Sequence, residues 1–313
     1  MARTHGMAAP RVREGRRWRS GPLVLLVLGI SFVIAACSPG GGPVDGQPQG
    51  GRTPTQPVRA SSSAAQTSSS AAAASARHWK LTWSADFNKP GALNKWLYVS
   101  GGSAGAGLKQ LQWYDTANAS VDKSGQLVIT ADRNTDGKTC WYGPCQYTST
   151  RMNTMNTFTQ TYGKFEARIK FPPGAGLWPA FWLEGANVDQ VGWPACGEID
   201  VIEPNGKNPY LLEGYAHAPH LRHQAFLTIS QPITGGFHTY GVVWNSRGIT
   251  WYFDGHAYSH QSAYKNWPFD KPFFIIMNLA VGGGYAGSPT GSTPFPAQMI
   301  VDWVRVYRHV AGP

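Results

Sequence analysis

Apolar and polar residues alternate along much of the second half of the chain. In GKFEARIKF, residues 163–171, aromatic and aliphatic residues occupy every second position and charged residues occupy the others. Because successive side chains of a strand point to opposite faces, this pattern predicts an antiparallel strand with one buried face. In GITWYFDGHAYSH, residues 248–260, two such runs flank Asp254-Gly255, a pair typical of tight hairpin turns.

Similar runs predict further strands in GQLVITA, TYGVVW, PFFIIMNLAV and MIVDWVRVYR, which begin at residues 125, 239, 272 and 299. No capped amphipathic helix of about a dozen residues and no internal repeat interrupts them. Many short strands separated by Gly- and Pro-rich turns favour an all-β sandwich or barrel.

The first 76 residues have a different character. Residues 1–20 carry six arginines and one glutamate, and an apolar run follows over 22–36. This pattern indicates an export signal at 1–36, and IAAC at 34–37 resembles a bacterial lipobox in which Cys37 is lipidated. An ordinary signal peptide or an uncleaved anchor is the alternative. Residues 37–76 are rich in Gly, Pro, Ser and Ala, which predicts a disordered tether. We therefore expect a cell-surface lipoprotein at the outer face of the cytoplasmic membrane, or a secreted protein.

Residues 77–313 are long enough for one large domain. Without the export segment the formal charge of +10 falls to +5, and no block of Lys and Arg suggests nucleic-acid binding. The 13 Trp, 13 Tyr and 13 Phe are the stronger signal, because aromatic rings serve as core and as ligand platforms. Cys140 and Cys145 bracket WYGP, and we expect a small disulfide between them, with Cys196 unpaired.

Two neighbouring segments suggest a catalytic cleft. In GLWPAFWLEG, a strand places Trp178, Ala180 and Trp182 on one face, suited either to a core or to stacking on sugar rings. CGEIDVIE, residues 196–203, then places three carboxylates within six residues. Three ionised groups are too costly to bury together in a core, which favours an aromatic-lined groove.

The spacing of the acids carries a structural prediction. In a regular strand Glu198 and Asp200 share a face, and Glu203 points to the other. One β-bulge after Asp200 returns Glu203 to the shared face, with roughly 13 Å between the Cα atoms of the glutamates and about 5 Å between their carboxyl groups. That separation is typical of a retaining glycosidase, in which one carboxylate attacks and the other acts as acid and then base. Asp200 between them raises the proton affinity of its neighbours.

WPACGEIDVIE resembles the E-x-D-x-x-E signature of glycoside hydrolase family 16 in its laminarinase-like form. LTWSADFN, YTSTRMNT, YGKFEARIKFPPGAGLWPAFW and ITWYFDGHAY also resemble its recurring segments, in the same order. The resemblance implies a concanavalin-like β-jelly-roll sandwich of two antiparallel sheets with a concave cleft. It also implies Glu198 as nucleophile, Asp200 as the assisting acid and Glu203 as general acid/base.

The resemblance carries over to other positions. It implies substrate contacts for Trp182, Trp193, Arg151, Asn153 and His217, and Trp178 shares the face of Trp182. A structural calcium with Asp302 and the Gly125 backbone as ligands is also implied, and no cofactor is needed for catalysis. His217, His220 and His223 form an alternative metal set, although an incomplete one.

Some positions depart from the family pattern. Gln110 stands where a glutamate is usual, Tyr285 stands where a tryptophan is usual, and residues 204–219 differ from the usual glycine-rich approach to the histidine. Because Gln110 and Tyr285 are expected to border the donor subsites, these changes concern substrate specificity rather than chemistry.

The sequence thus predicts a monomeric, retaining, endo-acting glycoside hydrolase of a polysaccharide, first of all a β-1,3-glucan. It needs no nucleic acid and meets a membrane only through its lipid anchor. The alternatives are a carbohydrate-binding protein or a transglycosylase on the same fold, or a hydrolase of a mixed-linkage glucan or a galactan.

Overall fold

The computed structural model describes residues 78–133 and 136–310. The predicted export signal, the lipidation site Cys37 and the tether lie outside the described residues. Within the described ranges, no helix is both long and apolar enough to span a membrane.

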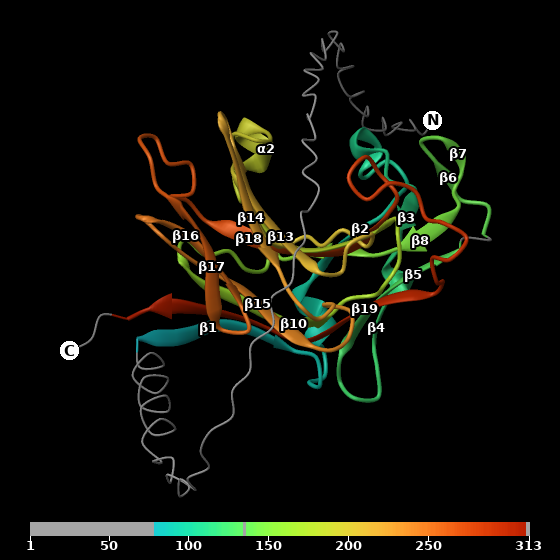
Figure 1. The fold of residues 1–313 in the computed structure, drawn as a ribbon, viewed down its shortest axis with the longest axis horizontal. Coiled ribbons are helices and arrows are strands. Elements are labelled where there is room, and N and C mark those ends of the chain that lie inside the picture. The colour runs from blue at the N-terminus through green and yellow to red at the C-terminus, as the bar shows by residue number, and fades with distance from the viewer. Residues whose placement is uncertain (1–77, 134–135, 311–313) are drawn as a thin grey trace, which may run out of the picture. The chain divides into compact units, whose positions relative to one another are not determined.

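Most strands belong to a ten-stranded sheet, in the order β17-β16-β15-β10-β19-β5-β8-β3, with β1 paired to β19 and β4 to β5 (Figure 1). Its strands are β1 (Trp79–Asp86), β3 (Gln112–Tyr114), β4 (Ala119–Val121), β5 (Leu127–Arg133), β8 (Tyr147–Ser149), β10 (Gly163–Lys170), β15 (His238–Asn245), β16 (Gly248–Phe253), β17 (His256–Ser262) and β19 (Ala297–His309). Neighbours run antiparallel except β3 and β8, which pair in parallel.

A second sheet has seven strands in the order β14-β13-β12-β11-β18-β9-β2. These are β2 (Leu97–Val99), β9 (Arg151–Asn153), β11 (Leu177–Gly185), β12 (Glu198–Ile202), β13 (Leu211–Ala218), β14 (Leu221–Thr228) and β18 (Phe273–Val281). A separate two-stranded ribbon joins β6 (Thr139–Cys140) to β7 (Gly143–Pro144). The described helical segments are short: η1 (Ala92–Lys95), η2 (Ala106–Leu108), η3 (Thr116–Asn118) and α2 (Val188–Val191).

The core lies between the two large sheets, which confirms the predicted all-β sandwich. Phe165, Ala167 and Ile169 of β10 are fully buried in one cluster with Phe181 of β11 and Met277 of β18. The apolar side chains of β10 therefore point into this core, and its charged side chains point to the outer surface of the ten-stranded sheet. The turn between β16 and β17 also matches the prediction, because both Asp254 (φ 46°) and Gly255 (φ 80°) are left-handed, as two-residue hairpin turns require.

One indole connects the sheets directly beneath the acidic strand. Trp251 of β16 donates from Nε1 to the backbone oxygen of Asp200 over 2.9 Å. Gly214 of β13 makes room for it, since a Cβ there would lie 2.8 Å from the Trp251 ring. The ten-stranded sheet thus helps to fix the backbone of β12.

Candidate active site

The acidic strand β12 contains the predicted bulge. Across β11 and β12, Phe181 pairs with Ile202 and Trp182 pairs with Asp200, so Val201 has no partner on β11. Val201 and Ile202 are both buried, and the chain resumes with Glu203 on the cleft side. Because of this extra residue, the side chains of Val201 and Ile202 stay in the core while the side chain of Glu203 points to the cleft.

The three carboxylates consequently meet at one site. Glu198 and Glu203 line a cleft of about 540 Å³, and a deeper recess of about 90 Å³ is lined by both glutamates and Asp200. The cleft floor belongs to the seven-stranded sheet. Beside β12, the strands β9, β11, β13 and β14 of this sheet and segments outside it contribute the other lining residues, which are Leu108, Arg151, Trp178, Trp182, Glu184, Trp193, Tyr215, His217, Arg222 and Tyr285.

Indole groups hold the acids and their surroundings in place. Trp178 donates from Nε1 to Glu203 Oε1 over 2.6 Å, and Trp182 donates from Nε1 to Asn278 Oδ1 over 2.9 Å. The Arg151 guanidinium lies 4.8 Å from the centre of the Trp182 ring, within cation–π range. Trp193 remains 58% exposed at the cleft, which leaves its ring free to meet a ligand.

His217 faces the other two acids. It pairs with Glu198 across β12 and β13, and its Nε2 lies 3.3 Å from Asp200 Oδ2 and 3.7 Å from Glu198 Oε1. Burial lowers the pKa of His217, partly opposed by the Glu198 charge. A neutral imidazole therefore stands beside the acids near neutral pH and does not cancel their charge.

Burial dominates the titration of the three acids. It raises the pKa of Asp200 to about 8, with Glu184 adding to the effect. Burial and then the Asp200 charge also raise the pKa of Glu198 and of Glu203 well above the ordinary value. Close carboxylates cannot all ionise, so this group retains protons at neutral pH.

Sequence reasoning missed two acids that influence this group. Glu184 pairs with Glu198 across β11 and β12 and lines the cleft, and burial raises its pKa. Glu213 of β13 is 7% exposed, accepts from the Tyr215 hydroxyl over 3.2 Å, and raises the pKa of Glu203 after the larger effects of burial and Asp200. The period-two spacing from Trp182 to Glu184 was an available signal for the first.

Most of the substrate-contact positions expected from sequence line the cleft or its recess. Arg151, Trp178, Trp182, Trp193, His217 and Tyr285 line the cleft, and Gln110 lines the recess. Tyr285 also donates its hydroxyl to the backbone oxygen of Glu203 over 2.7 Å. Asn153 lines neither space, and its Oδ1 accepts from the Met155 backbone over 3.0 Å, so its substrate contact stays a prediction.

The alternative metal set of three histidines is not assembled. His217 lies on the cleft face, while His223, whose Nε2 lies 3.1 Å from Ser259 Oγ, is paired with Ala216 at a position of the opposite parity. His220 is exposed in the turn between β13 and β14. The three side chains therefore have separate environments.

The predicted calcium ligands do not suit the ion. Arg168 donates from Nη1 to Asp302 Oδ2 over 2.7 Å, so a guanidinium already neutralises this carboxylate. Calcium requires six to eight oxygen ligands and favours uncompensated negative charge. Gly125, whose backbone is the other predicted ligand, lies in the turn between β4 and β5.

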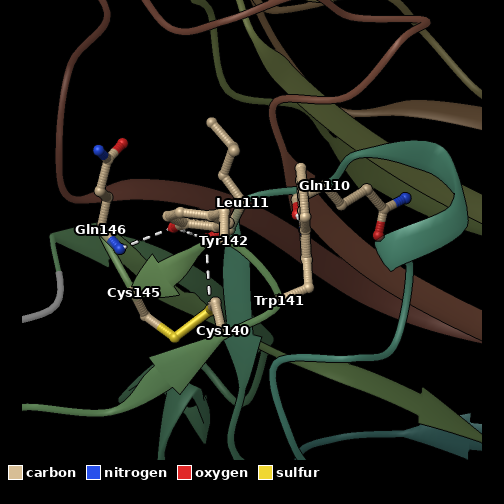
Figure 2. Close-up of a disulfide and its surroundings, with 7 residues drawn as sticks. All are labelled: Gln110, Leu111, Cys140, Trp141, Tyr142, Cys145 and Gln146. Atoms are coloured by element: carbon tan, nitrogen blue, oxygen red, sulfur yellow. Dashed lines mark hydrogen bonds between the residues drawn. A yellow bond between two sulfur atoms is a disulfide. The ribbon is translucent and has the colours of Figure 1, made fainter.

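The cysteines of the described chain fall into two kinds. Cys140 and Cys145 form a disulfide across the ribbon of β6 and β7 (Figure 2). Cys196 is free and buried, two residues before β12. The first pair closes a surface loop, whereas the third cysteine belongs to the interior.

Comparisons with known proteins agree with this architecture. The model of glycosyl hydrolases family 16 matches residues 108–305. A β-glucanase of Rhodothermus marinus is 38% identical over 258 residues, covering 75% of this chain and 87% of that protein. A glucan endo-1,3-β-glucosidase of Cryptopygus antarcticus is 35% identical over 250 residues, covering 72% and 88%. The crystal structure of the laminarinase catalytic domain of Thermotoga maritima is 36% identical with a TM-score of 0.69, covering 75% of this chain and all of that one.

Proposed function

Because the chain belongs to the glycosyl hydrolases of family 16, we propose that it cleaves internal bonds of a β-1,3-glucan with retention of anomeric configuration. The observation that carries the proposal is the bulge in β12, which brings Glu198 and Glu203 into one cleft. The names of the β-glucanase and laminarinase relatives support the choice of glucan.

In this mechanism Glu198 is the nucleophile. Its carboxylate attacks the anomeric carbon and forms a glycosyl ester, while Glu203 donates its proton to the departing glycosidic oxygen. In the second step Glu203 takes a proton from water, whose oxygen attacks the same carbon and releases Glu198. The two displacements invert the centre twice and so retain its configuration.

Asp200 keeps the roles of the two glutamates apart. Its pKa is raised to about 8, so it shares the protons of the group with the glutamates, and its negative charge favours the protonated form of Glu203. The raised pKa of Glu203 suits a group that must begin the cycle protonated. Trp178 limits that rise through its hydrogen bond, which favours the anion needed in the second step.

The aromatic walls supply sugar binding. Trp182 and Trp193 present ring surface to the cleft, and Arg151 beside Trp182 offers donors to hydroxyl groups. Gln110 and Tyr285 replace the usual glutamate and tryptophan, and we assign to them the discrimination among β-glucans.

A substrate panel tests the proposal. The full-length protein is incubated with laminarin, lichenan, xyloglucan and agarose, and new reducing ends are measured. We expect the highest rate on laminarin, with the β-anomer released first when the product is followed by NMR. An α-anomer as first product contradicts the two-step mechanism, and a faster rate on agarose contradicts the β-1,3-glucan assignment. The carbohydrate-binding alternative is not favoured, because all three carboxylates are present in the cleft.

We also propose that the protein is exported and held at the cell surface by a lipid on Cys37. The basic residues of 1–20, the apolar run that follows and the lipobox-like IAAC support this proposal. Mass spectrometry of the membrane fraction should find a diacylglyceryl group on Cys37, and Cys37→Ala should remove it. An unmodified cysteine in a membrane-bound wild-type protein contradicts the proposal.

A further inference from the structure

The disulfide-closed loop from Cys140 to Cys145 carries two aromatic residues that the catalytic mechanism does not use. Trp141 and Tyr142 lie between the two cysteines, at the tip of the β6–β7 ribbon (Figure 2). Their rings meet edge to face, with centroids 5.2 Å apart and planes at 78°. The cross-link and the ring contact both limit the conformational freedom of the loop.

Both rings are fastened to consecutive backbone carbonyls at the cleft. Trp141 donates from Nε1 to the oxygen of Gln110 over 2.6 Å, and the Tyr142 hydroxyl donates to the oxygen of Leu111 over 2.6 Å. The Tyr142 oxygen also accepts from the Gln146 backbone over 2.9 Å. Gln110 itself lines the catalytic recess and bridges Gly282. The loop is therefore attached to the wall of the cleft.

These contacts satisfy the polar N–H group of Trp141, but they leave much of its ring uncovered. The side chain is 46% exposed although its only polar atom is already bonded within the protein. A large ring that is fixed in orientation loses little conformational freedom when a ligand covers it. Its remaining surface is apolar and flat, which suits the C–H face of a pyranose ring.

The segment 108–111 lies between the cleft and this loop. Leu108 is 56% exposed, lines both the cleft and the recess, and precedes Gln110 by two residues. Trp193 is the exposed aromatic of the cleft itself. Leu108, Gln110 and Trp141 thus connect the catalytic centre to the outer loop.

We propose that Trp141 is the stacking platform of a distal subsite, which takes a glucosyl unit of the polysaccharide beyond those held in the cleft. The proposal rests on the proposed function, since the chain that reaches Trp141 is the one cleaved at Glu198. Its ligand is a sugar ring of an extended β-glucan, and its effect depends on the length of that chain.

The test compares Trp141→Ala with wild type in the full-length protein, on laminari-oligosaccharides of increasing length and on laminarin. We expect kcat/KM on laminarin to fall about tenfold, with the shortest cleaved oligosaccharide unaffected. Trp141→Phe should recover part of the loss, because it keeps a flat ring. Tyr264→Ala is the matched control, since Tyr264 is a 40% exposed aromatic that lines neither the cleft nor the recess.

The disulfide offers a second variant. Replacing both Cys140 and Cys145 by Ser should give the same length-dependent loss, because the loop no longer holds the ring in place. An equal loss on all lengths overturns the proposal, since it indicates damage to the catalytic centre, and an unchanged rate on laminarin overturns it too.

A binding measurement separates this proposal from the catalytic one. In a Glu198→Gln background, calorimetric titration with laminarin should show about tenfold weaker binding when Trp141→Ala is added. Should the wild type cleave no β-glucan, the proposed function fails while this titration still decides the subsite. Equal binding with and without Trp141→Ala overturns the subsite.

Discussion

The strands β10 and β12 share an alternation of apolar and charged residues, yet their charged side chains have opposite environments. On β10 the charges face outward and pair with opposite signs, as between Lys164 Nζ and Glu166 Oε2 over 2.9 Å. On β12, Glu198 and Asp200 carry the same sign, and no Lys or Arg forms an ion pair with either in the described chain. The nearest partner of both is the largely neutral His217.

The difference separates a structural pattern from a functional one. Partly exposed ion pairs such as those of β10 contribute little to the free energy of folding. Like charges in a buried site oppose folding unless protons neutralise them, so β12 persists only because the surrounding sandwich is stable. The place of the irregularity is the second difference. On β12 the register shifts against β11 directly after Asp200, whereas β10 keeps its register with β15 and shifts only against β19, between Arg168 and Ile169.

The largest expected effect comes from removing the charge of Glu198. Glu198→Gln should reduce kcat by at least about 10⁴-fold, because the amide cannot form the glycosyl ester. Release of reducing ends from laminarin measures it. The β10 counterpart Glu166→Gln should stay within about twofold of wild type. Comparable losses in the two variants would contradict the contrast between the strands.

Ionisation of Asp200 should lower the free energy of unfolding. Its folded pKa of about 8 exceeds the ordinary 3.8, so the native state binds the proton more tightly than the unfolded state. The stabilisation is full below the ordinary pKa and is lost as pH rises through about 8. Asp200→Asn, which cannot ionise, should therefore be more stable than wild type at pH 9, by on the order of 2 kcal/mol, with little difference at pH 4.

Thermal unfolding at both pH values measures this effect, and about 2 kcal/mol corresponds to a Tm increase of roughly 4–8 °C for a domain of this size. Asp302→Asn is the control, since its carboxylate is paired to Arg168 near the surface. A Tm gain of Asp200→Asn that is equal at pH 4 and pH 9 would contradict the titration of Asp200.

A smaller effect should follow from Glu213. Burial, Asp200 and then Glu213 raise the pKa of Glu203, whereas Trp178 and Arg222 lower it. Glu213→Gln removes one negative charge that raises the pKa of Glu203, so Glu203 should lose its proton at lower pH. The alkaline limb of the plot of kcat/KM against pH should therefore move to lower pH. Glu213→Asp keeps the charge and should leave the limb near its wild-type position. A lower rate with an unmoved limb would indicate a packing role alone.

The smallest effect is expected on β10. Arg168→Ala breaks the pair with Asp302 while both side chains are partly exposed, so the free energy of unfolding should fall by less than about 1 kcal/mol. Urea denaturation measures it, and the rate on laminarin should not change. A loss of several kcal/mol would show that this ion pair of β10 contributes strongly to stability, which contradicts the prediction.

Local periodicity was enough to predict β10, the β16–β17 hairpin and the sandwich, because each depends on residues close in sequence. The bulge after Asp200 was also predictable, since three acids and three aliphatic residues had to separate within six positions. Glu213 and Arg222 were not predictable as neighbours of Glu203, because they reach it only through the register of β13 and β14. The hydrogen bond between Asn153 and the Met155 backbone was not predictable either, since it is set by the turn after β9.

The indole of Trp251 has a consequence for dynamics. Since it crosses the sandwich to the Asp200 carbonyl, β12 cannot swing open without also disturbing β16 on the far sheet. Amide hydrogen exchange along β12 should accordingly require the cooperative unfolding of both layers, whereas the rim loops exchange by local fluctuations. The strand that carries the acids is therefore a rigid surface to which the polysaccharide adapts, and any opening or closing of the cleft takes place in the loops at its rim.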